Sequence, residues 1–225
     1  MTRILDSKRR GSTSGQTGSV MVFLHGYGAD GADLLGLAEP LAEHLPDTVF
    51  VAPDAPERSA MNPMGYQWFP IPWLDGSDPV EAEQAMDAAV DDLNAYLDDL
   101  MRNEGIGADQ LVLVGFSQGT MMALHVALRR DAPVAALVGF SGRLLRPETL
   151  EAELKSKPPV LLIHGDQDDV VPPQSLPEAA QALQDAGLDV YAHVMEGTAH
   201  GIAPDGLSVA LAFVRDRLGL DNPAR

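Results

Sequence analysis

The sequence has no cysteine, few basic residues and few aromatic residues. The lack of cysteine excludes disulfide frameworks, thiolate zinc sites, iron–sulfur clusters and a cysteine nucleophile. The 15 Lys and Arg residues are outnumbered by 33 Asp and Glu residues, which gives a formal net charge of -18. A chain this acidic repels nucleic-acid phosphates and anionic membrane surfaces. We therefore expect it to bind no nucleic acid.

Long apolar runs are also missing. No run approaches the roughly 18 residues that a membrane-spanning helix needs. The segment from Met1 to Ser19 is polar and lacks the apolar stretch of a signal peptide. We expect a cytoplasmic protein without stable membrane insertion. Residues 1–19 are expected to be a poorly ordered or edge segment, and residues 20–225 a single domain.

Short apolar runs alternate along the chain with longer amphipathic segments. Most of the short runs are continuously apolar, as in parallel strands that are buried on both faces. The expected strands are Val20–Leu24, Val49–Ala52, Leu111–Gly115, Val134–Phe140, Val160–Ile163 and Val190–Val194. The expected helices are Ala32–Leu45, Val80–Arg102, Gln118–Arg129, Pro147–Leu154, Leu176–Ala186 and Leu207–Leu218. This alternation predicts an α/β fold with one doubly wound, mostly parallel sheet and helices on both faces.

The segment from Gly115 to Gly119 carries the strongest chemical signal. It reads Gly-Phe-Ser-Gln-Gly and lies between an expected strand and an expected helix, which is the context of a nucleophile elbow. The sharp turn lifts the Ser117 hydroxyl above the sheet. The amide of Gln118, at a helix N-terminus, is able to donate to a developing oxyanion. We predict that Ser117 is a catalytic nucleophile.

A serine hydroxyl needs a base, and the base needs an orienting acid. After a nucleophile elbow, the acid and then the histidine follow in chain order. Among the six histidines, His200 lies in a glycine-flanked loop after the last expected strand, so we predict that it is the base. Asp166, Asp168 and Asp169 share the turn after the preceding strand, and spacing alone does not choose among them.

The connection between residues 53 and 79 is unusually long, and it contains both tryptophans. Connections of this length inside a compact domain are usually functional or disordered, and so many large apolar side chains argue against disorder. We predict that this loop packs onto the domain and forms the wall of an apolar substrate pocket. The residues expected to line the pocket are Trp68, Phe69, Trp73, Leu144 and Leu145.

Together these features resemble the α/β-hydrolase superfamily. Within it, the chain is similar to the phospholipase/carboxylesterase family, which includes acyl-protein thioesterases and small bacterial carboxylesterases. The resemblance extends from Val20 to Leu218. Besides the elbow, the motifs that carry it are Phe23-Leu24-His25-Gly26-Tyr27-Gly28, Trp68-Phe69, Phe140-Ser141-Gly142, His164-Gly165-Asp166-Gln167-Asp168 with Val171-Pro172, and Ala199-His200-Gly201.

The resemblance implies an α/β-hydrolase fold without a large lid domain, and a Ser-His-Asp mechanism without cofactor or metal. It selects Asp168 as the acid, because the family's Asp is the fifth residue of the His-Gly-x-x-Asp run; Asp169 remains a minor alternative. It places the oxyanion hole at the amides of Tyr27 and Gln118. The implied substrate is a small-molecule ester or thioester. A carboxylesterase for small to medium acyl chains is expected, with an acyl-protein thioesterase or lysophospholipase as alternatives. Family members often form dimers, so a homodimer is compatible with the resemblance.

Three other hypotheses compete with that of a serine hydrolase. Gly26-Tyr27-Gly28-Ala29-Asp30-Gly31 fits the dinucleotide fingerprint, and Asp54 follows at the end of the next strand. That oxidoreductase reading leaves the elbow and His200 unexplained. A non-catalytic binding protein on the same scaffold would usually have lost a triad residue, and none is missing. A calcium site in the aspartate-rich turn lacks the Gly and Glu of an EF-hand loop.

Overall fold

A seven-stranded sheet forms the centre of the computed structural model, which describes residues 2–221. The strand order is β1-β3-β2-β6-β7-β8-β9. β1 is antiparallel to β3, and the other neighbouring strands are parallel. The strands are β1 (Ser7–Arg10), β2 (Ser19–Leu24), β3 (Thr48–Pro53), β6 (Leu111–Phe116), β7 (Ala136–Phe140), β8 (Val160–Gly165) and β9 (Val190–Met195). The six apolar runs predicted as strands form the parallel part of the sheet.

Helices follow most of the strands. They are α1 (Gly31–Leu35), α2 (Ala38–Ala42), α3 (Pro72–Asp75), α4 (Pro79–Glu104), α5 (Gln118–Ala127), α6 (Leu150–Glu153), α7 (Ser175–Asp185) and α8 (Pro204–Arg217), with 3-10 turns η1 (Ala108–Gln110) and η2 (Pro147–Thr149). The single helix predicted over Ala32–Leu45 is instead two short helices. Gly36, a weak helix former, ends the first, and Pro40 lies in the first turn of the second, where its missing N–H is tolerated.

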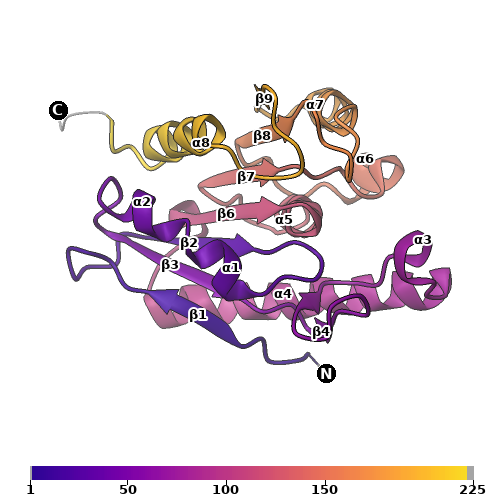
Figure 1. Ribbon diagram of the computed structural model, residues 1–225. Helices are drawn as coiled ribbons and strands as arrows, with labels where there is room; N and C mark the ends of the chain where they lie inside the picture. The colour runs from indigo at the N-terminus through magenta and orange to yellow at the C-terminus, as the bar shows by residue number, and fades with distance from the viewer. Residues whose placement is uncertain (1, 222–225) are drawn as a thin grey trace.

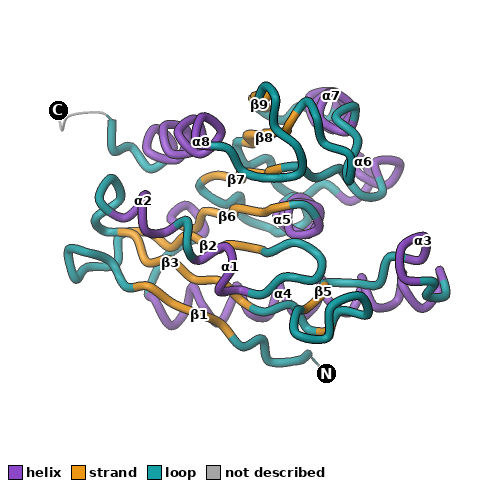
Figure 2. Tube along the Cα trace, viewed as in Figure 1, coloured by secondary structure: helices purple, strands orange, loops and turns teal. Residues whose placement is uncertain are grey.

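Two apolar layers sandwich the sheet, because successive side chains of each buried strand point to opposite faces. On β2, Val20, Val22 and Leu24 join the cluster that includes α4, α5 and α7. Met21 and Phe23 join the cluster that includes α1, α2 and α8. Figures 1 and 2 show α1, α2 and α8 in front of the sheet and α4 behind it. This arrangement confirms the predicted doubly wound sheet with helices on both faces.

The first residues of the chain contribute the edge strand β1, which pairs with β3 from Ser7 opposite Pro53 to Arg10 opposite Phe50. Its side chains are largely exposed. Arg9 and Arg10 form ion pairs with Glu104 and Glu39. Between residues 2 and 221, no helix combines the length and apolar character needed to cross a membrane.

The long connection after β3 is folded onto the domain. It contains the antiparallel pair β4 (Glu57–Arg58) and β5 (Tyr66–Gln67) and the short helix α3. The amide of Gly28 donates to the carbonyl oxygen of Tyr66 at 2.8 Å. The connection is therefore held against the loop that follows β2.

The parallel strands all end at one edge of the sheet. In Figure 1 the arrowheads of β6, β7 and β8 point the same way, toward the right of the view. Ser117 follows β6 directly, Ser141 follows β7, and the aspartate-rich turn follows β8. The elbow, the segment after β7 and the aspartate-rich turn therefore lie together at the carboxyl edge of the sheet.

Candidate active site

Ser117 stands on a strained turn between β6 and α5. Its backbone has φ 54° and ψ -117°, a left-handed conformation that is uncommon for a residue with a side chain. The two flanking glycines, Gly115 and Gly119, allow the strand and the helix to approach each other closely at this turn. A Cβ built at Gly115 would lie 2.4 Å from the amide nitrogen of Thr120, and one at Gly119 would lie 1.8 Å from the carbonyl oxygen of Leu24. The strand and the helix approach each other too closely for any other residue at these two positions.

His200 and Asp168 are in direct contact. The Nδ1 atom of His200 is 2.7 Å from Oδ2 of Asp168. Asp168 is buried, and the side chain of His200 is 17% exposed. Because a carboxylate only accepts hydrogen bonds, Nδ1 carries the proton, and Nε2 of the neutral ring is left as a base.

The His200 ring also lies against the elbow. Its centroid is 4.8 Å from the ring centroid of Phe116, the residue immediately before Ser117. The contact connects the loop after β9 with the end of β6. The His200–Asp168 pair therefore lies next to the turn that carries Ser117.

The Asp168 carboxylate is held from several sides. Its Oδ1 accepts hydrogen bonds from the amides of Val170 and Val171, both at 2.9 Å. The Nε2 atom of His164 donates to the carbonyl oxygen of Val171 at 2.9 Å and lies 3.2 Å from Oδ2 of Asp168. Burial raises the pKa of Asp168, but the hydrogen bonds from His200, Val171 and Val170 outweigh it and hold the pKa below its usual value. The carboxylate is ionised near neutral pH.

The two neighbouring aspartates have other surroundings. Asp166 is exposed, and its Oδ1 accepts a hydrogen bond from the amide of Gly197 at 2.7 Å. Asp169 is exposed. Among the three aspartates of this turn, Asp168 is the one in contact with His200.

The side chain of Gln118 joins the start of α5 to the long connection. Its Oε1 accepts a hydrogen bond from the amide of Trp68 at 2.9 Å, and its Nε2 donates to the carbonyl oxygen of Phe69 at 2.8 Å. The Gln118 amide is in the first turn of α5 and has no acceptor within the helix. Tyr27 lies in the facing loop, where its hydroxyl donates to Asp75 at 3.0 Å. The sequence analysis considered only the backbone amide of Gln118 and missed this use of its side chain.

Trp68 was predicted to line the substrate pocket, but it does not line either cavity described below. Its side chain is fully buried in the core, and its Nε1 donates to the carbonyl oxygen of His25 at 3.0 Å. His25 in turn donates from Nδ1 to the Gly26 carbonyl oxygen and accepts from the Ala55 amide at Nε2. Burial lowers the pKa of His25. His25 and Trp68 therefore support the loops of the site from inside the core.

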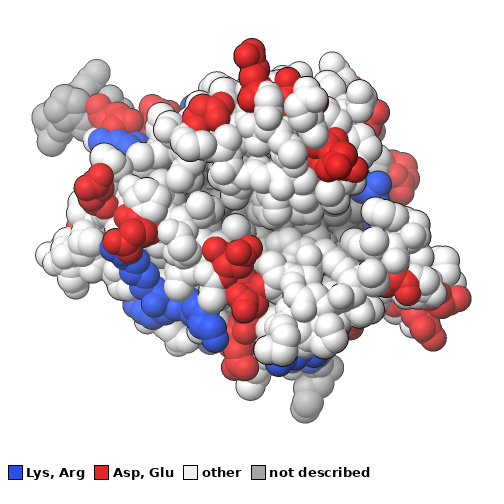
Figure 3. Space-filling model, in the orientation of Figure 1, with Lys and Arg blue, Asp and Glu red and all other residues white. Residues whose placement is uncertain are grey.

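Two cavities are lined in part by Arg143, in the segment that follows β7. One of about 200 Å³ is lined by Phe69, Pro70, Ile71, Pro72, Trp73, Met121, Arg143, Val170, Val171 and Pro172. A second, of about 520 Å³, is lined by Arg143, Leu144, Leu145, Arg146, Pro147, Pro172, Gln174, Ser175, Glu178, Ala179 and Ala182. Phe69 and Trp73 therefore line one cavity, and Leu144 and Leu145 line the other. Figure 3 shows a recess near the centre of the face in view, surrounded mostly by uncharged atoms.

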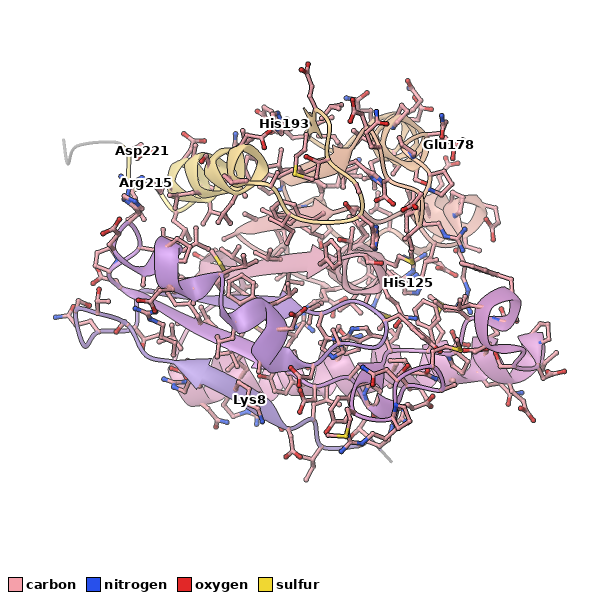
Figure 4. All side chains as sticks on the ribbon, in the orientation of Figure 1. Lys8, His125, Glu178, His193, Arg215 and Asp221 are labelled. Carbon is pink, nitrogen blue, oxygen red and sulfur yellow. The ribbon has the colours of Figure 1, made fainter. Side chains whose placement is uncertain are left out.

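Two of the remaining histidines have surroundings that set them apart from His200. His193, on β9, is 2.9 Å from Oδ2 of Asp205 at the start of α8. His125 is buried on α5, and burial together with Arg129 and Arg146 lowers its pKa to about 4. Figure 4 shows the two on different parts of the fold, His193 at the outer strand and His125 among the helices behind the sheet.

The features that suggested a dinucleotide site have structural roles in this fold. The Oδ1 atom of Asp54 accepts a hydrogen bond from the amide of Gly31 at 2.8 Å. α1, which begins at Gly31, is only five residues long. The carboxylate that would bind a ribose thus joins the end of β3 to the start of α1.

Comparison with known proteins agrees with this geometry. A family model described as phospholipase/carboxylesterase matches residues 11–218. The chain belongs to this family. It is an ester hydrolase with the α/β-hydrolase fold, as the sequence motifs predicted.

Relatives within the family carry both esterase and thioesterase names. Acyl-protein thioesterase 1 of Saccharomyces cerevisiae is 31% identical over 213 residues, which cover 88% of this chain and 92% of the yeast protein. Esterase YpfH of Escherichia coli is 27% identical, with 87% of this chain and 82% of that protein covered. Among solved structures, esterase PE8 superposes with a TM-score of 0.90 at 45% identity, covering 95% of this chain and 99% of that one.

Proposed function

We propose that this ester hydrolase is a carboxylesterase for small to medium acyl chains that works through an acyl-enzyme on Ser117. The 2.7 Å contact between Nδ1 of His200 and Oδ2 of Asp168, next to a serine with φ 54°, is the observation that carries the proposal. The contact fixes the ring tautomer, so that Nε2 is the basic atom. Asp168 orients His200 and stabilises its protonated form.

In the proposed reaction, Nε2 of His200 removes the proton of the Ser117 hydroxyl while the oxygen attacks the ester carbonyl carbon. The tetrahedral intermediate collapses, the bond to the alcohol oxygen breaks, and protonated His200 gives its proton to the leaving alcohol. Water then attacks the acyl-enzyme with the same base. The carboxylic acid is released, and the Ser117 hydroxyl is restored.

The amides of Tyr27 and Gln118 are proposed as the oxyanion donors. Two features support this role: the Gln118 amide belongs to the first turn of α5, and Gly28 next to Tyr27 is held by its hydrogen bond to Tyr66. A donor fixed before the reaction loses little energy to reorganisation. Each such donor contributes about 3 kcal/mol to the stabilisation of the intermediate.

The cavity beside Phe69 and Trp73 is proposed as the acyl pocket. Its lining is mostly apolar, and its volume of about 200 Å³ is small beside the roughly 300–1,000 Å³ of pockets for drug-sized ligands. Met121 lines it one helical turn beyond Ser117, and its amide donates to the Ser117 carbonyl oxygen. A pocket of this size and position suits short and medium acyl groups.

A thioesterase is the second candidate, because several relatives, including the yeast protein, are named acyl-protein thioesterase. The same triad attacks thioesters, and lysophospholipids are a third option with the same chemistry. Initial rates on short esters, long esters, acyl thioesters and a lysophospholipid separate the three. The carboxylesterase proposal expects the highest kcat/KM on short and medium oxygen esters, and a preference for long acyl thioesters would replace it.

The Ser117→Ala variant tests the mechanism. We expect ester hydrolysis to fall to background while the far-UV circular dichroism stays native. Ser208→Ala is the matched control, because Ser208 is an exposed serine on α8 that donates to the Pro204 carbonyl oxygen. More than a few per cent of wild-type activity in Ser117→Ala would remove Ser117 from the mechanism.

A further inference from the structure

Arg143 is an arginine without a partner in a strongly acidic protein. The other arginines between residues 2 and 221 each have a hydrogen bond or an ion pair from the guanidinium group. No such contact, and no aromatic ring, engages Arg143 within that range. The chain has more than two acidic residues for each basic one. Most of the other arginines pair with an Asp or Glu carboxylate, but Arg143 has no such partner and is exposed.

The position of Arg143 relates it to the candidate active site. It follows Ser141 and Gly142 at the carboxyl end of β7. A Cβ built on Gly142 would lie 3.0 Å from the carbonyl oxygen of Ser117. The backbone that carries Arg143 is therefore packed against the elbow.

Arg143 also stands where the two cavities meet. It lines the smaller apolar cavity with Phe69 and Met121, and it lines the larger one with Leu144 and Glu178. Pro172 is the other residue common to both. A ligand bound in either cavity would therefore lie next to Arg143.

The nearby charges leave Arg143 available. Arg146, in the same segment, is engaged by Glu83 and Asp87. Glu178 lines the larger cavity from α7 and forms no ion pair with Arg143 in the part of the chain that the structure describes; Figure 4 places its side chain at the outer surface of α7. Arg143 is thus the cation at the junction that is free to bind an anion.

We propose that Arg143 forms an anion subsite that binds a carboxylate carried by the substrate, so that esters with a free carboxylate are a preferred substrate class. A guanidinium group offers paired N–H donors that match the two oxygens of a carboxylate. The subsite offsets locally the repulsion that a net charge of -18 imposes on anionic substrates. This inference rests on the proposed esterase function.

The test compares charged and neutral esters of equal chain length. Monomethyl adipate, with a carboxylate on the acyl side, is paired with methyl hexanoate. Butyryloxyacetate, with a carboxylate on the alcohol side, is paired with ethyl butyrate. The measured quantity is the ratio of kcat/KM for the charged ester to that for its neutral partner, from proton release at constant pH. The pair that responds identifies the side of the substrate that reaches Arg143.

Arg143→Gln is expected to lower this ratio about fivefold for at least one pair, which is the upper end of what an exposed ion pair contributes. Arg143→Lys should retain part of the ratio. Glu178→Gln should raise it, because it removes the negative charge from the same cavity. Added salt should reduce the difference in this ratio between wild type and Arg143→Gln, because salt screens the attraction between Arg143 and the substrate carboxylate.

Arg102→Gln is the matched control. Arg102 is exposed near the end of α4, where it pairs with Asp99, and α4 ends at the edge of the sheet opposite the carboxyl ends of the strands. The same change in net charge there should leave the ratio unaltered. An unaltered ratio in Arg143→Gln for both pairs, or an equal fall in Arg102→Gln, overturns the subsite while neutral esters are still hydrolysed. Failure of the wild type to hydrolyse any of the four esters overturns the proposed function itself.

Discussion

Replacement of Asp168 by Asn gives a sharp test of the orienting acid. Asn has the same shape, but one oxygen becomes an NH₂ donor. Oδ1 of Asp168 accepts two backbone amides, from Val170 and Val171. The amide oxygen of the variant must keep that position, because an NH₂ group there would face two donors. The NH₂ group is then directed at His200.

This orientation reverses the His200 tautomer. An NH₂ group at the place of Oδ2 requires His200 to accept at Nδ1, so its proton moves to Nε2. A ring protonated at Nε2 cannot take the proton of Ser117. The loss of the correct tautomer lowers kcat by about 10⁴, which corresponds to about 5 kcal/mol in the activation free energy. The NH₂ group also faces the N–H of His164, which adds to the disturbance.

The assay is kcat on a short neutral ester for Asp168→Asn and Asp169→Asn, with circular dichroism to verify folding. Asp169 is the matched control, because it is adjacent, exposed and loses the same charge. We expect Asp169→Asn to stay within about twofold of wild type, as surface substitutions away from a site usually do. A loss confined to Asp169→Asn would transfer the role to that residue. More than a tenth of wild-type kcat in Asp168→Asn would refute the tautomer argument.

Three further predictions concern Trp68, Phe69 and His125. Trp68→Ala should lower the free energy of unfolding by about 3–5 kcal/mol in urea titrations, because its side chain is fully buried. Phe69→Ala should instead shift the preference among acyl chain lengths, and equal chain-length profiles for Phe69→Ala and wild type would contradict its pocket role. The pKa of His125 is lowered to about 4 in the folded protein from 6.5, so the unfolded chain binds more protons between these values and stability is lost as pH falls through that window. Between about pH 7.5 and about pH 5, we expect the free energy of unfolding to fall by about 1 kcal/mol from this effect. This value is discounted because solvent screens the charged groups that face His125. His125→Leu should remove this part of the pH dependence, while the control His44→Gln, at an exposed histidine, should keep it. An equal pH dependence in His125→Leu and wild type would refute the assignment.

Much of the fold was readable from local patterns. Strands buried on both faces are continuously apolar, so a run such as Val160–Ile163 can be recognised as a strand without knowing which strands it pairs with. The elbow is equally local, because Gly115, Ser117 and Gly119 satisfy steric demands within one turn. The edge strand β1 escaped prediction as a defined strand. Its residues Ser7–Arg10 are polar and are held mainly by backbone pairing with β3.

Segments distant in sequence decided the rest. Three aspartates share one turn, and only the fold brings the imidazole of His200, in the loop after β9, to one of them, Asp168. Trp68 and Phe69 are both large aromatic residues of one loop, and the sequence does not distinguish them, but Trp68 is fully buried in the core whereas Phe69 is partly buried and lines a cavity. The freedom of Arg143 is likewise invisible in the sequence, because it depends on which carboxylates the other arginines engage.

By itself the sequence determined the six parallel strands, the elbow around Ser117 and the chain order of Ser117, the aspartate-rich turn and His200, since each depends on neighbouring residues or on order alone. Tertiary structure decided which acid meets His200, which aromatic side chains border the cleft and which cation remains unpaired at its junction. These are contacts between separate segments, and their geometry exists only once the parallel strands have aligned their carboxyl ends at one edge.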